Sequence, residues 1–279
     1  MGTLVFDLDG TICFDRHSVA PSIKRSMEAV GERHSIVIAS ARHPANIITT
    51  IANPWFSLWD IVGANGAISY AKGRLCSEQR MPTTPTRLAL RTLSVLGCPF
   101  LAYGADFVIF SQTAHPLHGA ISADIGTTLR RGSDTDLEIL IKVLALPQSD
   151  DPRPLAACQA IVGLQVCTHA DGSFDIVAAG VDKASALRTL GHTLPTLASF
   201  GNDLNDLPLL LHARHAVCVG DNPILVSVAN HQIPPGTGQV EAIAELILKI
   251  AAYTDTCDEL TPIGDDRGIF YESDLSRRS

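Results

Sequence analysis

A short apolar run near the amino terminus ends in two aspartates and a glycine, and no other feature constrains the fold as strongly. Residues 3–6 read T-L-V-F, and residues 7–11 read D-L-D-G-T. The apolar run predicts a buried parallel strand, and Gly10 predicts a sharp turn at its carboxyl end. Ligands of open α/β sheets bind at the carboxyl ends of the strands, and residues two apart share one face of a strand. We therefore expect Asp7 and Asp9 to face one site, where they could hold a hard cation and divide nucleophilic and acid–base roles.

Two other structures could produce the same short pattern. An Asx turn with solvated acids needs no chemistry and is common after strands. An EF-hand loop also begins with D-x-D, but Ser18 stands where its bidentate glutamate should fall, which excludes it. A motif this short does not separate a turn from a catalytic site, so the rest of the chain has to decide.

The composition indicates a globular protein without a basic surface. The chain has 279 residues, of which 46% are hydrophobic and 18% are charged, enough for one large or two medium domains with proper cores. A net charge of -8 argues against a general binder of nucleic acid or membrane surfaces. We therefore expect neither nucleic acid nor membrane among the partners, and the sequence leaves the oligomeric state open.

The cysteines and the amino terminus both bear on the compartment. Seven cysteines are scattered without a C-x-x-C pair, which argues against a zinc knuckle or a thioredoxin-type motif and favours reduced thiols. Asp7 and Asp9 fall where a signal peptide would have its apolar region, and no uninterrupted apolar run has membrane length. These observations predict a cytoplasmic protein.

The two ends of the chain alternate between strand and helix patterns. The first part predicts helices at 21–33 and 44–52, strands at 35–39 and 60–63, and a hairpin about residues 72–73. The last part predicts helices at 182–190, 207–212, 222–229 and 240–251 and strands at 196–200 and 216–219, with Asp182 as a helix cap. This order is typical of a doubly wound, Rossmann-like parallel sheet.

The middle of the chain has a different pattern. It predicts helices at 86–96, 114–130 and 152–160, strands at 100–103, 107–110 and 138–144, and a hairpin over 165–177. Hairpins and helices together indicate an α+β unit inserted into the α/β pattern. We therefore expect a discontinuous core domain of residues 1–76 and 181–253, an inserted domain of residues 77–180, and a C-terminal tail of residues 254–279.

Polar residues occur just where four of the buried apolar elements stop. They are the Asp7 and Asp9 pair, Ser40 with Arg42, Lys183 at a helix start, and the segment 201–206, which reads G-N-D-L-N-D. Two acids, a hydroxyl, a cation and a second acidic cluster are the groups needed for magnesium-dependent phosphoryl transfer through a covalent aspartyl intermediate.

These motifs resemble those of the haloacid dehalogenase superfamily of phosphatases. Residues 7–11 match its first motif, Ser40 the second, Lys183 the third and residues 201–206 the fourth. The segments N-G-A at 65–67 and G-V-D-K-A at 180–184 resemble its Cof-type sugar-phosphatase branch, which has a C2 (type IIB) cap between the second and third motifs. The resemblance implies an α/β core with an inserted α+β cap.

The resemblance also implies a role for each site residue. Asp7 would be the nucleophile and a Mg2+ ligand, and Asp9 would protonate the leaving oxygen and then activate water, with its backbone carbonyl at the metal. Asp206, with Asn202 or Asp203, would complete the metal site. The phosphate-binding residues would be Ser40, Lys183, Thr11, Ala41 and Arg42, and the substrate contacts Asn65, Gly66 and Asn205.

Two positions depart from the family pattern. The fourth motif usually has an acid directly after the glycine, but this chain has Asn202 there and the acid at Asp203. An amide oxygen can bind Mg2+ with less charge, so the change predicts weaker metal binding. Ala41 replaces the usual glycine of the second motif, which is a mild change.

Phosphatase is the function that this set predicts, acting on a small phosphorylated metabolite such as a sugar phosphate. In this family the acid at Asp9 distinguishes phosphatases from dehalogenases and ATPases, and residues 11–40 leave no room for the cap of a phosphomutase. The alternatives are a specialised phosphatase for a glycosyl-phosphate or phosphoglycerate conjugate and a weakly catalytic regulator. His115, His118 and His169 of the inserted domain could contact the substrate, whereas His212 and His215 are expected to be structural.

Overall fold

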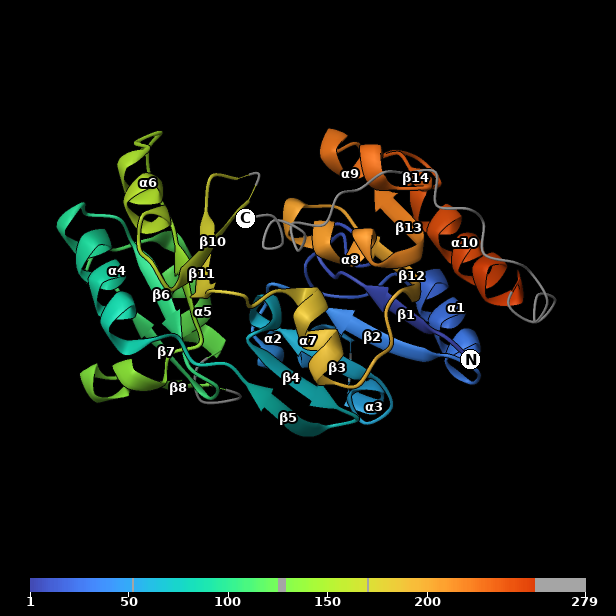
Figure 1. Ribbon diagram of the computed structural model, residues 1–279, viewed down its shortest axis with the longest axis horizontal. Coiled ribbons are helices and arrows are strands. Elements are labelled where there is room, and N and C mark those ends of the chain that lie inside the picture. The colour runs from blue at the N-terminus through green and yellow to red at the C-terminus, as the bar shows by residue number, and fades with distance from the viewer. Residues whose placement is uncertain (52, 125–128, 170, 254–279) are drawn as a thin grey trace, which may run out of the picture.

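The computed structural model describes residues 1–51, 53–124, 129–169 and 171–253, and the expected tail of residues 254–279 lies outside them. Two β-sheets with their own helices lie side by side, one built from the two ends of the chain and one from its middle (Figure 1). No helix within the described ranges is long and apolar enough to cross a membrane.

The larger sheet has eight strands, and the amino-terminal strand lies inside it. Their order is β14 (His231–Ile233), β13 (Ala213–Val219), β12 (Thr196–Gly201), β1 (Thr3–Phe6), β2 (Ser35–Ala39), β3 (Asp60–Gly63), β4 (Ile68–Ala71) and β5 (Arg74–Glu78). The strands from β14 to β3 are parallel, whereas β4 and β5 add an antiparallel hairpin at one edge. β1 therefore has a parallel neighbour on each side.

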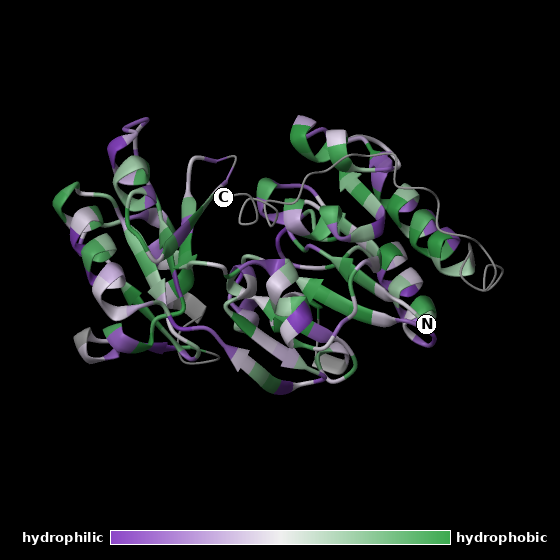
Figure 2. Cartoon of the chain, viewed as in Figure 1, coloured by the Kyte–Doolittle hydropathy of each residue, from purple (hydrophilic) through white to green (hydrophobic). Residues whose placement is uncertain are grey.

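Helices cover both faces of this sheet because successive side chains of each strand point to opposite sides. Leu4 and Phe6 face a cluster that includes residues of α1 (Pro21–Gly31), α2 (Pro44–Ile51), α3 (Asn53–Phe56) and α10 (Gln239–Tyr253). Val5 faces the opposite cluster, with α7 (Lys183–Thr189), α8 (Leu207–Leu211) and α9 (Pro223–Val228). Burial on both faces requires apolar residues throughout, and β1 and β2 are accordingly hydrophobic, while the more exposed edge strand β5 mixes hydrophilic and hydrophobic residues (Figure 2).

The smaller sheet and its helices form the cap. Its strands lie in the order β10 (Leu164–Thr168), β11 (Phe174–Ala178), β9 (Lys142–Ala145), β6 (Phe100–Tyr103), β7 (Phe107–Phe110) and β8 (Arg130–Arg131). All neighbours are antiparallel except β7 and β8. One face packs on α4 (Thr83–Val95) and α6 (Arg153–Gln159), and α5 (Pro116–Asp124) follows β7.

The cap contacts the larger sheet through an apolar cluster of its own. Residues next to the larger sheet pack in this cluster against Ile141 and Val177 of the cap; they are Ala64, Ala67 and Ile68. The chain crosses between the two sheets over residues 79–82, after β5, and again over residues 179–182, before α7. The prediction of a doubly wound α/β core with an inserted α+β cap is confirmed.

The structure differs from the sequence prediction at several elements. The prediction of a strand at 138–144 is wrong for its first residues, because Asp134–Ile139 forms a 3-10 helix and β9 begins only at Lys142. Ser133 and Asp136 stabilise the start of this helix by mutual capping bonds. The short elements α3, β8 and β14 were not predicted. The helix expected over 114–130 ends at Asp124, and residues 125–128 lie outside the described residues.

Candidate active site

Three loops and one helix start meet at the carboxyl ends of the central strands. Asp7 follows β1, Ser40 follows β2 and Asn202 follows β12, and these strands are neighbours in the order β12-β1-β2. Lys183 is the first residue of α7, and Asp182 is its N-cap, as expected. Parallel strands bring their carboxyl ends to one edge of a sheet, and the four motifs therefore meet although they are far apart in sequence.

Lys183 is buried between two carboxylates. Its Nζ donates to Asp7 Oδ1 at 2.7 Å and to Asp206 Oδ1 at 2.5 Å, and its side chain has no exposed surface. Burial raises the pKa of the Asp7 carboxyl to about 7, and Asp206 adds to this rise while Lys183 opposes it. Burial alone would lower the pKa of the Lys183 ammonium, but the two acids outweigh burial and raise it. One buried cation thus faces two acids.

Thr11 joins Asp7 to Asn202. The Thr11 hydroxyl lies 3.0 Å from Asp7 Oδ2 and 3.3 Å from Asn202 Oδ1, so both oxygens are neighbours of the same group. Gly10 makes this approach possible, because its φ is +75° and a Cβ there would stand 2.2 Å from Asn202 Nδ2. The carboxylate of Asp7 and the amide oxygen of Asn202 are hard ligands side by side, which fits a Mg2+ ion.

The carboxylates of Asp206 and Asp203 are engaged by groups other than Asp7 and Thr11. Asp206 Oδ2 accepts the backbone N–H groups of Asn202 and Asp203 at 3.0 and 3.1 Å, so this buried carboxylate shapes the loop and holds Lys183. Asp203 Oδ1 accepts the Leu204 N–H at the start of a 3-10 turn, and its Oδ2 faces His169 of the cap. Of the two residues expected as metal ligand after Gly201, the structure brings Asn202 and not Asp203 beside Asp7.

The donor set around Asp7 is mixed. Within the described part of the chain, no group of three or more His, Cys, Asp or Glu side chains is arranged to hold a metal ion. A Mg2+ ion here would therefore depend on the amide of Asn202 and on backbone oxygen in addition to the Asp7 carboxylate.

Asp9 is held by Arg42. The Arg42 Nε donates to Asp9 Oδ2 at 2.6 Å and its Nη2 donates to Asp9 Oδ1, which is a two-pronged ion pair. The same guanidinium reaches Thr50 Oγ1 at 2.8 Å and the Arg16 carbonyl at 3.0 Å. The Asp9 side chain is 44% exposed, so substrate can reach it. Ser40 is buried, and its Oγ accepts the Arg42 N–H at 3.1 Å.

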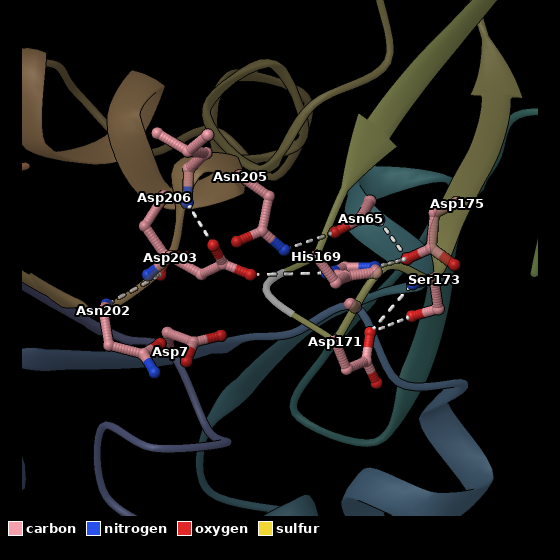
Figure 3. Close-up of polar contacts among 12 residues, drawn as sticks. Asp7, Asn65, His169, Asp171, Ser173, Asp175, Asn202, Asp203, Asn205 and Asp206 are labelled. Atoms are coloured by element: carbon pink, nitrogen blue, oxygen red, sulfur yellow. Dashed lines mark hydrogen bonds and ion pairs between the residues drawn. The ribbon is translucent and has the colours of Figure 1, made fainter. Parts of the chain in front are cut away.

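Asn65 and Asn205 lie between the core site and the polar residues of the cap (Figure 3). Asn65 has a positive φ of 57°, and a Cβ at Gly66 would stand 2.2 Å from the Asp182 carbonyl, which explains the N-G pair. The Asn65 Nδ2 donates to Asp175 Oδ2 at 2.7 Å, and its Oδ1 accepts from Asn205 Nδ2 at 3.0 Å. These side chains contact each other and the cap, and none has a hydrogen bond to Asp7 among those described.

The cap contributes three polar residues, of which sequence reasoning named only one. His169 was a candidate, and its Nε2 lies 3.0 Å from Asp175 Oδ2 and its Nδ1 3.4 Å from Asp203 Oδ2. Asp175 and Lys142 were missed, because a lone polar residue in a short strand gives no sign of burial. His118 instead makes an edge contact with the ring of Phe110, and the ring of His115 lies tilted beside that of His118.

A model of the family described as haloacid dehalogenase-like hydrolase matches residues 4–247. The chain belongs to this family. This match confirms the expected family and the expectation of an enzyme. No curated protein matches the chain.

Three solved structures share the fold of this chain. A sugar phosphatase of subclass IIB is 19% identical, with a TM-score of 0.71 over 92% of this chain and 99% of that chain. A phosphatase of the superfamily from Bacteroides thetaiotaomicron is 17% identical, with a TM-score of 0.71 over 90% and 96%. A protein from Streptococcus mutans UA159 is 17% identical, with a TM-score of 0.74 over 91% and 99%. Identities this low establish the architecture alone.

Proposed function

We propose that this protein is a Mg2+-dependent phosphatase that hydrolyses a small phosphate ester through an aspartyl phosphate on Asp7. The observation that carries the proposal is the fixed carboxylate of Asp7, which Lys183 holds at Oδ1 and Thr11 at Oδ2. Two residues further on, the exposed acid of Asp9 stands beside a guanidinium. A nucleophile and a second acid at one strand end are what a two-step phosphoryl transfer requires.

The first step forms a bond between a carboxylate oxygen of Asp7 and phosphorus. The bond from phosphorus to the leaving oxygen breaks, and that oxygen takes the proton of Asp9. Holding the Asp7 carboxylate in one orientation lowers the entropic cost of this attack. In the second step Asp9, now a carboxylate, takes a proton from water, whose oxygen attacks phosphorus while the bond between phosphorus and the Asp7 oxygen breaks. Inorganic phosphate leaves, and Asp7 returns as a carboxylate with Asp9 protonated.

The groups that bind the transferring phosphoryl oxygens surround Asp7. The ammonium of Lys183, the hydroxyl of Ser40 and the guanidinium of Arg42 supply fixed donors at the strand ends, where negative charge shifts during the reaction. The turn of Ala41 and the hydroxyl of Thr11 complete this side of the site. Because Arg42 already binds Asp9, it can place the leaving oxygen next to that acid.

A Mg2+ ion would be held by the Asp7 carboxylate, the Asp9 backbone carbonyl and the Asn202 amide oxygen. Asp206, which the sequence analysis also expected at the metal, has its two carboxylate oxygens engaged by Lys183 and by the loop backbone. When bound, the ion supplies charge neutralisation between the phosphate and the carboxylates. The position of Asp203, which faces the cap, leaves Asn202 as the ligand after Gly201. The lower charge of an amide supports a weaker affinity than a carboxylate would give.

The substrate that we propose is a sugar phosphate or a related phosphomonoester. The sugar phosphatase and the phosphatase among the structural relatives support this class. The described cysteines are free thiols, which supports the proposal that the enzyme works in the cytoplasm.

Phosphate release from a panel of sugar phosphates and phosphoglycerate derivatives tests the proposal, with and without Mg2+ and with Asp7→Asn in parallel. We expect metal-dependent turnover that falls by at least about 10³-fold in the variant. Turnover of phosphoglycerate or glycosyl conjugates alone would favour the specialised phosphatase. No turnover by folded protein at high Mg2+ would contradict the proposal and favour a regulatory protein.

A further inference from the structure

Asp175 is a buried charged residue that the proposed mechanism does not use. It lies on β11 of the cap and has no exposed surface, yet three polar side chains contact its carboxylate. Burial alone would raise the pKa of its carboxyl, but Lys142 and His169 outweigh burial and lower it. A buried carboxylate that stays charged has to be fixed by its partners, and those partners lead to the core.

Lys142 connects Asp175 to the turn that follows β2. Its Nζ lies 2.7 Å from Asp175 Oδ1 and donates to the carbonyl of Ala41 at 2.7 Å. Ala41 stands between the two phosphate-binding residues Ser40 and Arg42. A lysine of the cap therefore fixes the backbone of the phosphate-binding turn, and Asp175 fixes the lysine.

Asn65 connects Asp175 to the same turn from another direction. Its side chain donates to Asp175 Oδ2 at 2.7 Å, and its backbone N–H donates to the Ser40 carbonyl at 3.1 Å. The adjoining Ala64 N–H donates to the Arg42 carbonyl at 2.7 Å. The left-handed backbone of Asn65 is held from the cap by Asp175 and from the core by Asn205.

His169 connects Asp175 to the loop that carries Asn202. The imidazole lies between Asp175 and Asp203, with one ring nitrogen toward each carboxylate (Figure 3). Burial opposes the charged form, but the two carboxylates raise the pKa of His169 to about 9. This contact explains why an acid stands at Asp203 although it does not face Asp7.

We propose that Asp175 is a positioning residue, whose contacts with Lys142, Asn65 and His169 hold three loops of the phosphate site in one arrangement. The cap then acts as a template for the site in addition to covering it. This inference rests on the proposed phosphatase function for its kinetic consequence, but its structural consequence can be measured without turnover.

Asp175→Asn tests the proposal, because asparagine keeps the shape and removes the charge that Lys142 and His169 face. We expect kcat to fall about 10²-fold for a sugar phosphate and also for p-nitrophenyl phosphate, with KM changed by less than about threefold. Hydrogen exchange at the Ala64 and Asn65 amides should accelerate at least about tenfold. Asp136→Asn is the matched control, because it breaks a carboxylate ion pair with Arg130 in the cap away from these loops.

A folded Asp175→Asn protein that loses only affinity for the sugar phosphate, with normal kcat for p-nitrophenyl phosphate and normal amide exchange, would overturn the proposal. The same changes in Asp136→Asn would also overturn it, because they would report general loosening of the cap. If the wild type hydrolyses no ester, the proposed function fails while amide exchange still decides the positioning role.

A milder pair of variants decides the question if Asp175→Asn does not fold. His169→Gln removes the contacts of His169 with Asp175 and Asp203, whereas Asp203→Asn changes only the second of them. Both variants interrupt the same connection to the loop of Asn202 and leave the contact between Lys142 and Asp175 in place. We expect each to lower kcat about tenfold and to accelerate exchange in the backbone of residues 202–206, and the double variant to lose no more than either single one. Independent, multiplying losses, or no loss, would overturn the proposal.

Discussion

Two buried ion clusters lie on either side of the boundary between core and cap, and their charges are arranged in opposite ways. In the core, Lys183 stands between Asp7 and Asp206, so one cation serves two acids. In the cap, Asp175 stands between Lys142 and His169, so one acid serves two cations. Both clusters join a buried lysine to aspartates at similar distances, and they differ in the imidazole of the cap and in the balance of charge.

The imbalance is resolved differently on the two sides. Asp203 of the core faces His169 and completes an even set of two acids and two cations around Asp175. The cluster at Asp7 keeps more acids than cations, and Asp9 adds to this excess. Burial raises the pKa of Asp7 most, and the negative charges of Asp206 and Asp9 raise it further. We infer that the balanced cluster fixes structure, while the unbalanced one provides a place for a cation and a reacting phosphate.

Replacing the lysine of each cluster gives the largest contrast. Lys183→Met should lower kcat/KM by at least about 10³-fold, because it removes a phosphate donor and leaves two buried acids unpaired. The same change should lower the free energy of unfolding by about 3–5 kcal/mol, measured with urea. Lys142→Met is the matched control, with a comparable loss of stability but an activity loss at least about tenfold smaller. Equal activity losses in the two variants would remove the distinction between the clusters.

His43 connects core and cap without a charge, in contrast to the two ion clusters. This contrast can be tested by the pH dependence of the unfolding free energy. Its Nε2 lies 3.0 Å from the Gly104 carbonyl and its Nδ1 accepts the Ala45 N–H, which fits the uncharged ring, and burial lowers its pKa from 6.5 to about 4. Because the folded pKa lies below the unfolded one, its stabilisation is complete above about pH 6.5 and is lost as the pH falls toward about 4.

Urea unfolding of wild type and His43→Gln at several pH values measures this effect. The difference in unfolding free energy between the two proteins should change by up to about 3 kcal/mol over that interval, with the wild type losing more. A difference that stays constant with pH would show that His43 is not held neutral.

Arg42 differs from the two buried lysines because the acid that it binds, Asp9, is exposed. Arg42→Lys keeps the charge but loses the two-pronged contact with Asp9 and the contact with Thr50. We expect kcat/KM to fall roughly 30-fold, which corresponds to a loss of about 2 kcal/mol of transition-state stabilisation. The unfolding free energy should change little. Steady-state kinetics with one sugar phosphate would measure this, and full activity of the variant would contradict the role given to Arg42.

Asn202→Asp adds the acid that the family pattern has at this position and increases the imbalance of the core cluster. The Mg2+ concentration for half-maximal activity should fall about tenfold, because a carboxylate brings a full charge to the metal. Without Mg2+ the new acid lies beside Asp7, and the midpoint of thermal unfolding should fall by about 2–4 °C. An unchanged Mg2+ dependence would show that residue 202 is not a ligand.

The sequence predicted the core cluster because its residues follow a local rule. Each of Asp7, Ser40 and Lys183 stands where an apolar strand stops or a helix begins, and parallel topology brings such positions together. The choice between Asn202 and Asp203 could not be made in this way. It depends on Asp203 starting a 3-10 turn and facing a histidine 34 residues away in sequence.

The cap cluster was not predictable from the same rules. Asp175 and Lys142 lie within short strands, where alternating polar residues usually face solvent, and their burial results from docking against the core. The strand expected at 138–144 shows a related limit. Apolar spacing suggested a strand, but Ser133 and Asp136 cap a 3-10 helix that ends at Ile139. Such features depend on contacts between sheets and on side-chain bonds, and hydrophobic periodicity does not contain them.

Trapping the covalent intermediate tests the central claim most directly. Wild-type protein with Mg2+ and an active sugar phosphate is quenched in acid during turnover, and its peptides are analysed by mass spectrometry. The account predicts a phosphoryl group on the peptide that contains Asp7, located at Asp7 itself and missing in Asp7→Asn. Continued turnover by Asp7→Asn, or a phosphoryl group on another residue, would contradict it.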